Sequence, residues 1–230
     1  MPAITDARSL PPIAVHWVRN NVLAAIVSGV GSLLFYGVSD ATGAADADAG
    51  FGVIVTVYAG WIGLSAFVGA VNGILSGAVL QRILPSLPAR TWIALQVMIA
   101  VVIGIAGGMS LIAPPRDPTG TPDVSMLATV LGGLILGAIF GAAIGALEAL
   151  VLRRAAFGTG TWITCSIIAY AIALTFFASS AKLLEIGSNF AGEFISQALY
   201  FLASVMASLV MLPALRRLKT PLSTAPQYFT

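Results

Sequence analysis

Long apolar stretches alternate with short polar segments along the whole chain. Six stretches reach the roughly 20 residues that a helix needs to cross a hydrocarbon core of about 30 Å. The breaks between them carry acids, arginines or prolines, and no stretch shows the ten-residue alternation of a membrane-spanning strand. The pattern predicts an all-α integral membrane protein with six transmembrane helices. Their approximate ranges are 20–39, 51–80, 91–113, 124–152, 162–181 and 194–215.

Composition supports the same class. The 230 residues are 58% hydrophobic and only 9% charged, with a mean hydropathy of +0.98. A soluble domain is about 25% charged, so this chain could not cover a water-facing surface. A soluble enzyme, a nucleic-acid-binding module and a disordered chain are therefore excluded. We expect one polytopic membrane domain over residues 1–230, ending in a short basic tail at 216–230, with the lipid bilayer as its main partner.

The basic residues predict the orientation. If the amino terminus is cytoplasmic, nine of the eleven lysines and arginines fall on the inner side and two fall in outer loops, as the positive-inside rule requires. Both termini are then cytoplasmic, and the chain is placed in the cell (inner) membrane, with a bacterial source favoured. The inner residues are Arg8, Arg19, Arg82, Arg90, Arg153, Arg154, Arg216, Arg217 and Lys219, and the outer ones are Arg116 and Lys182.

An alternative concerns the start of the chain. Residues 22–38, followed by Ala45-Asp46-Ala47, could form a secretory signal peptide with a small-residue cleavage site. The apolar run exceeds the 7–15 residues usual for such a segment, and the preceding region is long. We favour a retained first helix.

The even-numbered stretches end alike. The segment from Gly73 to Arg82 aligns with the segment from Gly145 to Arg154, and Ser208 to Arg217 gives a weaker third copy. Thr91-Trp92-Ile93 and Thr161-Trp162-Ile163 open the stretches that follow the first two copies. We interpret this pattern as three helical-hairpin repeats. The alternative is that leucine-rich helices ending in arginine resemble one another by composition.

Three tryptophans occur near the cytoplasmic starts of helices, at Trp17, Trp92 and Trp162. An indole is amphipathic and is enriched where a helix meets the headgroups. We therefore interpret these residues as interface anchors, with an aromatic ligand site as the alternative.

Small residues form two stripes at four-residue spacing, which allow two helix backbones to approach closely in lipid. We expect the second and fourth stretches to be the tightly packed core of the bundle. Self-association, a partner subunit or the lining of a narrow pore remain alternatives. The candidate helix-packing residues are Gly69, Gly73 and Gly77 in the second stretch and Gly133, Gly137, Gly141 and Gly145 in the fourth.

Polar residues at depth are the candidate functional site. Glu148 is the only acid within a predicted span and shares a face with the glycine stripe, whereas Asn72 lies near the middle of the second span. Ionisable groups within a membrane are costly and are functional candidates by default. If the two stripes meet, Asn72 or Ser76 is the natural partner of Glu148. Gln96 of the third stretch is a further candidate, more suited to bonding a neighbouring helix than a substrate.

Catalytic patterns are absent from the sequence. The segment Gly63-Leu64-Ser65-Ala66 superficially resembles the serine motif of rhomboid proteases, but these enzymes need a histidine on a later helix, and the single histidine, His16, precedes the first span. No HExxH or phosphate-binding loop is present. We expect no enzymatic activity, no metal and no cofactor.

Two functions fit these features. The first is a non-catalytic membrane protein that acts through helix–helix packing, as a self-assembled bundle or as an accessory subunit of a membrane complex. The second is a small transporter or channel for a solute, an ion or a lipid, with Glu148 and Asn72 in the pathway. The spans contain no central proline that would break a helix at mid-depth, which favours the first function.

Overall fold

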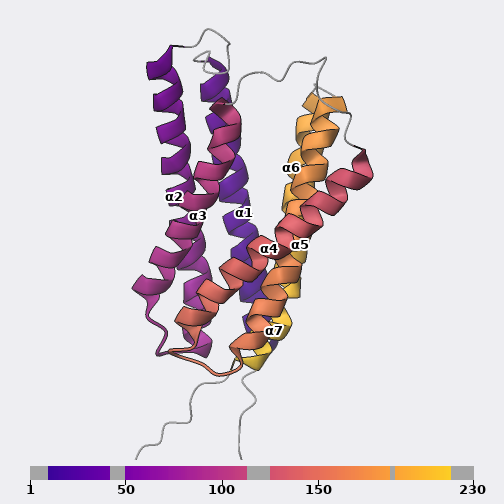
Figure 1. Cartoon of the computed structure of the whole chain (residues 1–230). Coiled ribbons are helices and arrows are strands. Elements are labelled where there is room, and N and C mark those ends of the chain that lie inside the picture. The colour runs from indigo at the N-terminus through magenta and orange to yellow at the C-terminus, as the bar shows by residue number, and fades with distance from the viewer. Residues whose placement is uncertain (1–9, 42–49, 113–124, 187–189, 219–230) are drawn as a thin grey trace, which may run out of the picture.

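The computed structural model describes residues 10–41, 50–112, 125–186 and 190–218, and every regular element in these ranges is a helix (Figure 1). The all-α class expected from the sequence is confirmed. The helices are α1 (Leu10–Ala41), α2 (Phe51–Ile83), α3 (Ala89–Ile112), α4 (Met126–Leu152), α5 (Thr159–Ile186), α6 (Phe190–Val210) and α7 (Leu212–Arg217).

Five helices are long and apolar enough to cross a membrane. They correspond to the first, second, fourth, fifth and sixth predicted stretches. Helix α3 has 24 residues in all, but its apolar segment Ala89–Ile105 is shorter than the others and does not meet this test. The helical, membrane-compatible character of the chain is therefore established, and the count of six spans stays a prediction.

Two boundaries differ from those predicted. Helix α1 begins at Leu10, ten residues before the expected start, because Pro11 and Pro12 fall in its first turn, where a missing N–H costs little. The last predicted stretch is divided at Met211 into α6 and α7. Pro213 lacks an N–H, and its ring clashes with the carbonyl four residues earlier, so it ends one helix and starts the next.

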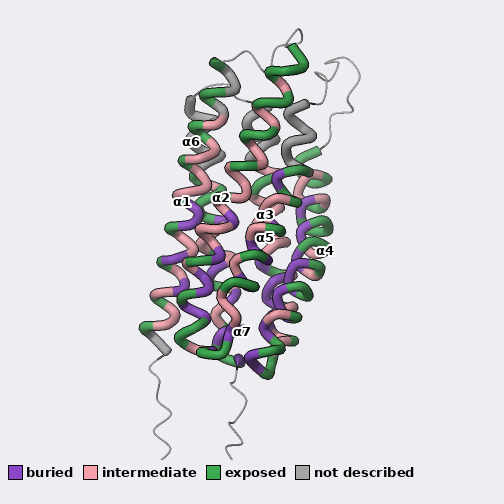
Figure 2. Tube along the Cα trace, turned by 90° about the vertical axis from the view of Figure 1, so that its left-hand side faces the viewer, coloured by how far each residue is buried: buried purple, intermediate pink, exposed green. Residues whose placement is uncertain are grey.

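The helices form a closed ring. Each of α1 to α6 contacts the next helix along the chain, and α6 contacts α1. The start of α1, the α2–α3 and α4–α5 connections and α7 lie at the same end of the bundle (Figure 1). Buried residues gather in the half of the bundle that includes this end (Figure 2). The two halves therefore differ, and the end that holds most of the described arginines is the well-packed one.

Connecting residues help to close that end. Leu84 and Leu87 follow α2 and are 0% and 3% exposed, and Ala155, after α4, is 0% exposed. Leu218, the residue after α7, is also buried in the same apolar cluster. Leu218, within the predicted basic tail, is thus still packed against the bundle, whereas Arg216 and Arg217 are exposed. Residues 219–230, the rest of that tail, lie outside the described residues, as do Ala45-Asp46-Ala47 of the possible cleavage site.

The glycine stripes lie against the helix that follows each in the chain. A Cβ atom built on Gly69 or Gly73 would come within 2.9 Å of a backbone Cα atom of α3. On α4, a Cβ atom on Gly133 or Gly141 would come within 2.7 Å of a Cα atom of α5. The stripes therefore pack α2 on α3 and α4 on α5. They do not meet each other, so the condition on which the predicted pairing of Glu148 with Asn72 or Ser76 depended is not met.

Two glycines of α4 provide a matched test of this packing. We expect Gly137→Ala to destabilise the protein by about 1–3 kcal/mol, because its Cβ would overlap the backbone of Tyr170 and Ala171. Gly132→Ala should be neutral or slightly stabilising, since nothing lies within 4 Å of the added atom. Cys165, the single cysteine and buried, reports unfolding by its reaction with a thiol-specific dye during heating. Equal melting temperatures for the two variants would contradict the packing.

Candidate functional site

The Glu148 carboxylate is bound from two neighbouring helices. Its Oε1 accepts a hydrogen bond of 2.7 Å from Gln96 Nε2 of α3, and its Oε2 accepts one of 2.7 Å from Trp162 Nε1 of α5. Glu148 is 7% exposed and Gln96 is 5% exposed. Both donors are uncharged, so the carboxyl group is satisfied by an amide and an indole. The partnership expected with Asn72 or Ser76 is wrong as a direct contact.

Asn72 reaches the carboxylate through Gln96. Asn72 Nδ2 donates to Gln96 Oε1 at 3.0 Å, and the same Gln96 side chain donates to Glu148. The four side chains Asn72, Gln96, Glu148 and Trp162 thus form a hydrogen-bonded chain that joins α2, α3, α4 and α5 in order. Three of the four predicted polar site residues belong to this chain.

Ser76, the fourth predicted polar residue, has a different partner. Its Oγ donates to the Asn72 carbonyl at 2.6 Å and accepts a hydrogen bond of 3.0 Å from Trp92 Nε1 of α3. Ser76 lies six residues before Arg82, and Glu148 lies six residues before Arg154. Ser76 and Glu148 thus occupy matching positions of α2 and α4. Each accepts a hydrogen bond from the indole N–H of a tryptophan near the start of the following helix, Trp92 of α3 and Trp162 of α5.

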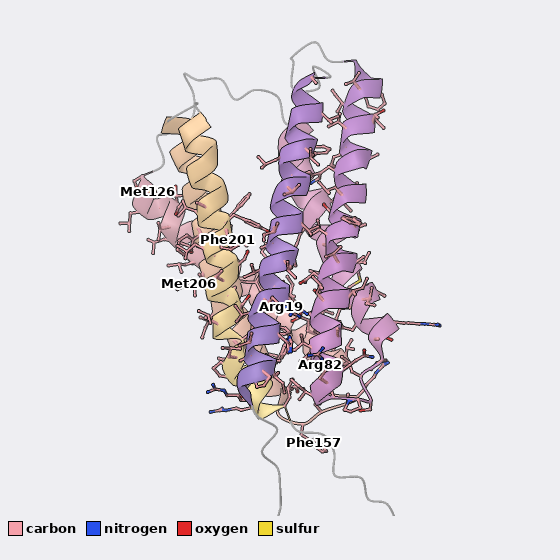
Figure 3. All side chains as sticks on the ribbon, turned by 180° about the vertical axis from the view of Figure 1, so that it is seen from behind. Arg19, Arg82, Met126, Phe157, Phe201 and Met206 are labelled. Carbon is pink, nitrogen blue, oxygen red and sulfur yellow. The ribbon has the colours of Figure 1, made fainter. Side chains whose placement is uncertain are left out.

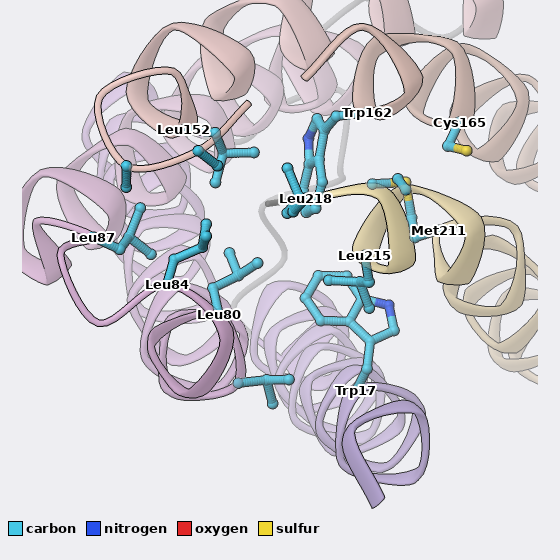
Figure 4. Close-up of a cluster of buried hydrophobic side chains, with 14 of the residues drawn as sticks. Trp17, Leu80, Leu84, Leu87, Leu152, Trp162, Cys165, Met211, Leu215 and Leu218 are labelled. Atoms are coloured by element: carbon cyan, nitrogen blue, oxygen red, sulfur yellow. The ribbon is translucent and has the colours of Figure 1, made fainter. Parts of the chain in front are cut away.

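The tryptophans are buried inside the bundle. Trp17, Trp92 and Trp162 are 4%, 1% and 1% exposed. The Trp162 ring makes edge-on contacts of 6.0 Å between ring centres with both other rings. Figure 4 shows Trp17 and Trp162 in the apolar cluster, together with leucines of α2, α4 and α7. The interpretation of the three as interface anchors is wrong, because buried acceptors and aromatic neighbours take the place of the headgroups.

Trp17 is the exception among the three. Its Nε1 is buried and has no hydrogen-bond partner in the described part of the chain, and neither has Nδ1 of the adjacent His16. The residue six positions before Arg217, which matches Ser76 and Glu148, is Met211. Met211 lies in the same apolar cluster as Trp17, and a thioether is only a weak acceptor.

Further polar contacts between helices were not predicted from the sequence, among them those of Asn20 and Trp61. Asn20, 7% exposed, donates from Nδ2 to the Leu75 carbonyl of α2 at 2.8 Å. Trp61 donates from Nε1 to the Gly104 carbonyl of α3 at 2.9 Å. Asn20 lies at the edge of the first predicted span, 20–39, where a polar residue can be hydrated and needs no partner in the protein. Only the earlier start of α1 puts it at a depth where its amide requires a partner.

Among the described residues, no three histidines, cysteines or carboxylates lie close enough to hold a metal. The Ser65 hydroxyl donates to the Trp61 carbonyl of its own helix turn at 2.9 Å. Comparison with protein-family models, with curated proteins and with solved structures gives no match. The geometry of these side chains is therefore the basis for any functional conclusion.

A phenylalanine series tests the indole hydrogen bonds. Trp162→Phe leaves a buried carboxylate oxygen without a donor and should cost about 1.5–3 kcal/mol beyond lost packing. Trp92→Phe removes a bond to a neutral hydroxyl and should cost about 1 kcal/mol. Trp17→Phe removes no hydrogen bond and serves as the matched control. Unfolding in detergent is expected to rank the losses in that order, and an equal loss in all three would refute the assignment.

Double-mutant cycles test the order of the chain of side chains. Alanine substitutions of Gln96 and Glu148 should be strongly non-additive, with a coupling energy of about 1 kcal/mol or more, because the two side chains touch. Asn72 and Glu148 should couple more weakly, through Gln96. Ser204, whose hydroxyl donates to the Tyr200 carbonyl of its own helix, should be additive with Glu148. A larger coupling for Asn72–Glu148 than for Gln96–Glu148 would contradict the geometry.

Proposed function

We propose that this chain is a non-catalytic, six-span protein of the inner membrane that acts through helix–helix packing, as a self-assembled bundle or as an accessory subunit of a membrane complex. The observation that carries the proposal is the internal use of the deep polar groups. Asn72, Gln96 and Glu148 are bonded to one another, and Trp162 completes the set. A carrier needs such groups to face its substrate, whereas a packing protein needs them to fix its helices.

The surface and the ends of the bundle support placement in a membrane. Many large apolar side chains are exposed, among them Leu34, Phe67, Leu127 and Ile139 at 58–68%, as lipid contact requires. The described arginines Arg82 and Arg90 flank the α2–α3 connection, Arg153 follows α4 and Arg217 ends α7, all at one end of the bundle. The positive-inside rule makes this end cytoplasmic, and both termini with it.

The three-hairpin organisation is part of the proposal. It is supported by the matching hydrogen bonds from Trp92 to Ser76 and from Trp162 to Glu148. It is also supported by the two glycine stripes, each of which packs on the following helix. Resemblance by composition alone would not give the same contact at the same position twice.

The closed end argues against a pore through the bundle. Trp92, Trp162, Leu80, Leu84 and Leu152 are each no more than 1% exposed and lie in one apolar cluster. Their side chains fill the interior at the arginine-rich end. An ion or a polar solute would have to pass through this packed layer, which offers it no polar surface.

One observation favours the alternative of transport. The hydrogen-bonded chain from Asn72 to Glu148 starts from a half-buried side chain of α2 and ends at an acid. Such a chain is the type of path along which a proton can move if the acid exchanges it with water. The test therefore has to measure association and proton movement on the same protein.

The full-length protein is extracted with its own lipids in polymer-bounded discs, and the copies and partners in each disc are counted by native mass spectrometry. We expect more than one copy, or one copy with a stoichiometric second subunit. The same protein, reconstituted in liposomes containing a pH-sensitive dye, should show no proton flux that depends on Glu148, with Glu148→Gln as the matched variant. Single copies without a partner, or a flux abolished in Glu148→Gln, would overturn the packing function.

A further inference from the structure

Three basic side chains meet where α1 and α2 pack at the arginine-rich end. Figure 3 shows Arg19 on α1 and Arg82 on α2, two helices in contact, with Arg19 the further of the two from the arginine-rich end. His16, one turn before Arg19, lies within electrostatic range of both arginines. We call His16, Arg19 and Arg82 the basic corner.

The helix directions bring these side chains together. Helix α1 leaves this end and α2 arrives at it, and side chains lean toward the amino terminus of their helix. Arg19 therefore leans toward the end and Arg82 leans away from it, so the two guanidinium groups converge.

Asn20 holds Arg19 in place. Its Oδ1 accepts hydrogen bonds from Nε and Nη2 of Arg19 at 3.4 and 3.3 Å, while its Nδ2 donates to the Leu75 carbonyl of α2. An arginine has five N–H donors, so the remaining donors of Arg19 are left for another acceptor. The Arg19 guanidinium is thus held by Asn20, whose own amide is fixed by its bond to α2.

The positive charge of the corner has no counter-charge in the described residues. Arg82 makes no hydrogen bond or ion pair there, and His16 Nδ1 is buried without a partner. Two guanidinium groups that share a site repel each other, and the cost grows where lipid and protein exclude water. Both arginine side chains are exposed at the outside of the ring, so an external anion can reach them.

We propose that the basic corner binds the phosphate group of an anionic phospholipid of the cytoplasmic leaflet. Basic pockets between transmembrane helices on the cytoplasmic side suit anionic headgroups, and a guanidinium presents paired donors to phosphate oxygens. The acyl chains would then lie on the exposed apolar faces of α1 and α2, where Leu23, Ile26 and Ile74 are 43–54% exposed. The inference rests on the proposed membrane orientation but not on the copy number of the protein.

The test is a titration of the delipidated full-length protein in detergent with dioleoylphosphatidylglycerol, followed by native mass spectrometry. Dioleoylphosphatidylcholine, whose choline neutralises the phosphate, is the lipid control. Arg19→Gln combined with Arg82→Gln should weaken binding of phosphatidylglycerol about 25-fold, since each basic residue near a membrane surface contributes about fivefold. Arg90→Gln combined with Arg153→Gln removes the same charge from exposed positions of the same end and should change binding less than twofold.

The outcomes are distinct. Equal weakening by both variant pairs, or equal binding of both lipids by the wild-type protein, would overturn the site. Displacement of phosphatidylglycerol by millimolar inorganic phosphate would assign the corner to a soluble anion and overturn the proposal of a lipid ligand.

The double variant Arg19→Lys with Arg82→Lys keeps the charge if the glutamine pair fails to fold. It should bind phosphatidylglycerol a few-fold more weakly than the wild type, because lysine lacks the paired donors. Binding at wild-type strength by the lysine pair would contradict recognition by guanidinium groups. A change in lipid binding leaves the number of copies per disc unaffected, so this proposal and the packing function fail separately.

Discussion

A carboxyl group inside a membrane bundle has to find its hydrogen-bond donors in the protein, because the surrounding lipid offers none. Glu148 meets this constraint with one donor from α3 and one from α5. Both bonds require the helices to be close, and the glycines supply that closeness. Gly145 lies three residues before Glu148, and Ser166 lies one turn after Trp162. A Cβ atom added to Gly145 would come within 2.7 Å of the Ser166 side chain, so α4 and α5 are close at this point. The glycine stripe and Glu148 therefore act together: the stripe lets α4 approach α5 closely, and this approach lets the Trp162 indole reach the Glu148 carboxylate.

The same relation holds between α2 and α3 with weaker chemistry. Gly73 lies three residues before Ser76, and an added Cβ there would come within 2.9 Å of the Ile93 Cα atom, next to Trp92. The Trp92 indole then reaches a hydroxyl instead of a carboxylate. At the third position Met211 takes the place of the acceptor, and the Trp17 indole N–H has no hydrogen-bond partner in the described residues. Polar contacts that join α1 to its neighbours include the Asn20 bond to α2 and the bond from Tyr200 of α6 to Ser28.

The sequence predicts the helical class and the approximate ranges well, because lipid imposes one length and one composition on every span. It also identifies Glu148, Asn72, Gln96 and Ser76 as the deep polar residues. It does not predict the hydrogen-bond partners of these residues, because a glycine stripe identifies the packing face of a helix but not the helix that packs against it. The tryptophans were misassigned for a related reason: an indole needs one apolar surface and one acceptor, which a headgroup or a buried side chain supplies equally well. The 14- and 16-residue separations of Trp162 from Glu148 and of Trp92 from Ser76 were the available signal.

The access of water to the Glu148 carboxylate bears on its function. An acid that carries protons has to exchange its donors for water during each cycle, so at least one of its bonds has to open readily. Glu148 is bonded on both oxygens, and its two donors are locked in turn: Gln96 by Asn72, and Trp162 by edge-on contacts with two other indoles. Opening either bond would disturb a second helix pair as well. The presence of an acid in the membrane does not by itself distinguish a carboxylate that stabilises a fold from one that conducts protons. The free-energy cost of opening its hydrogen bonds does.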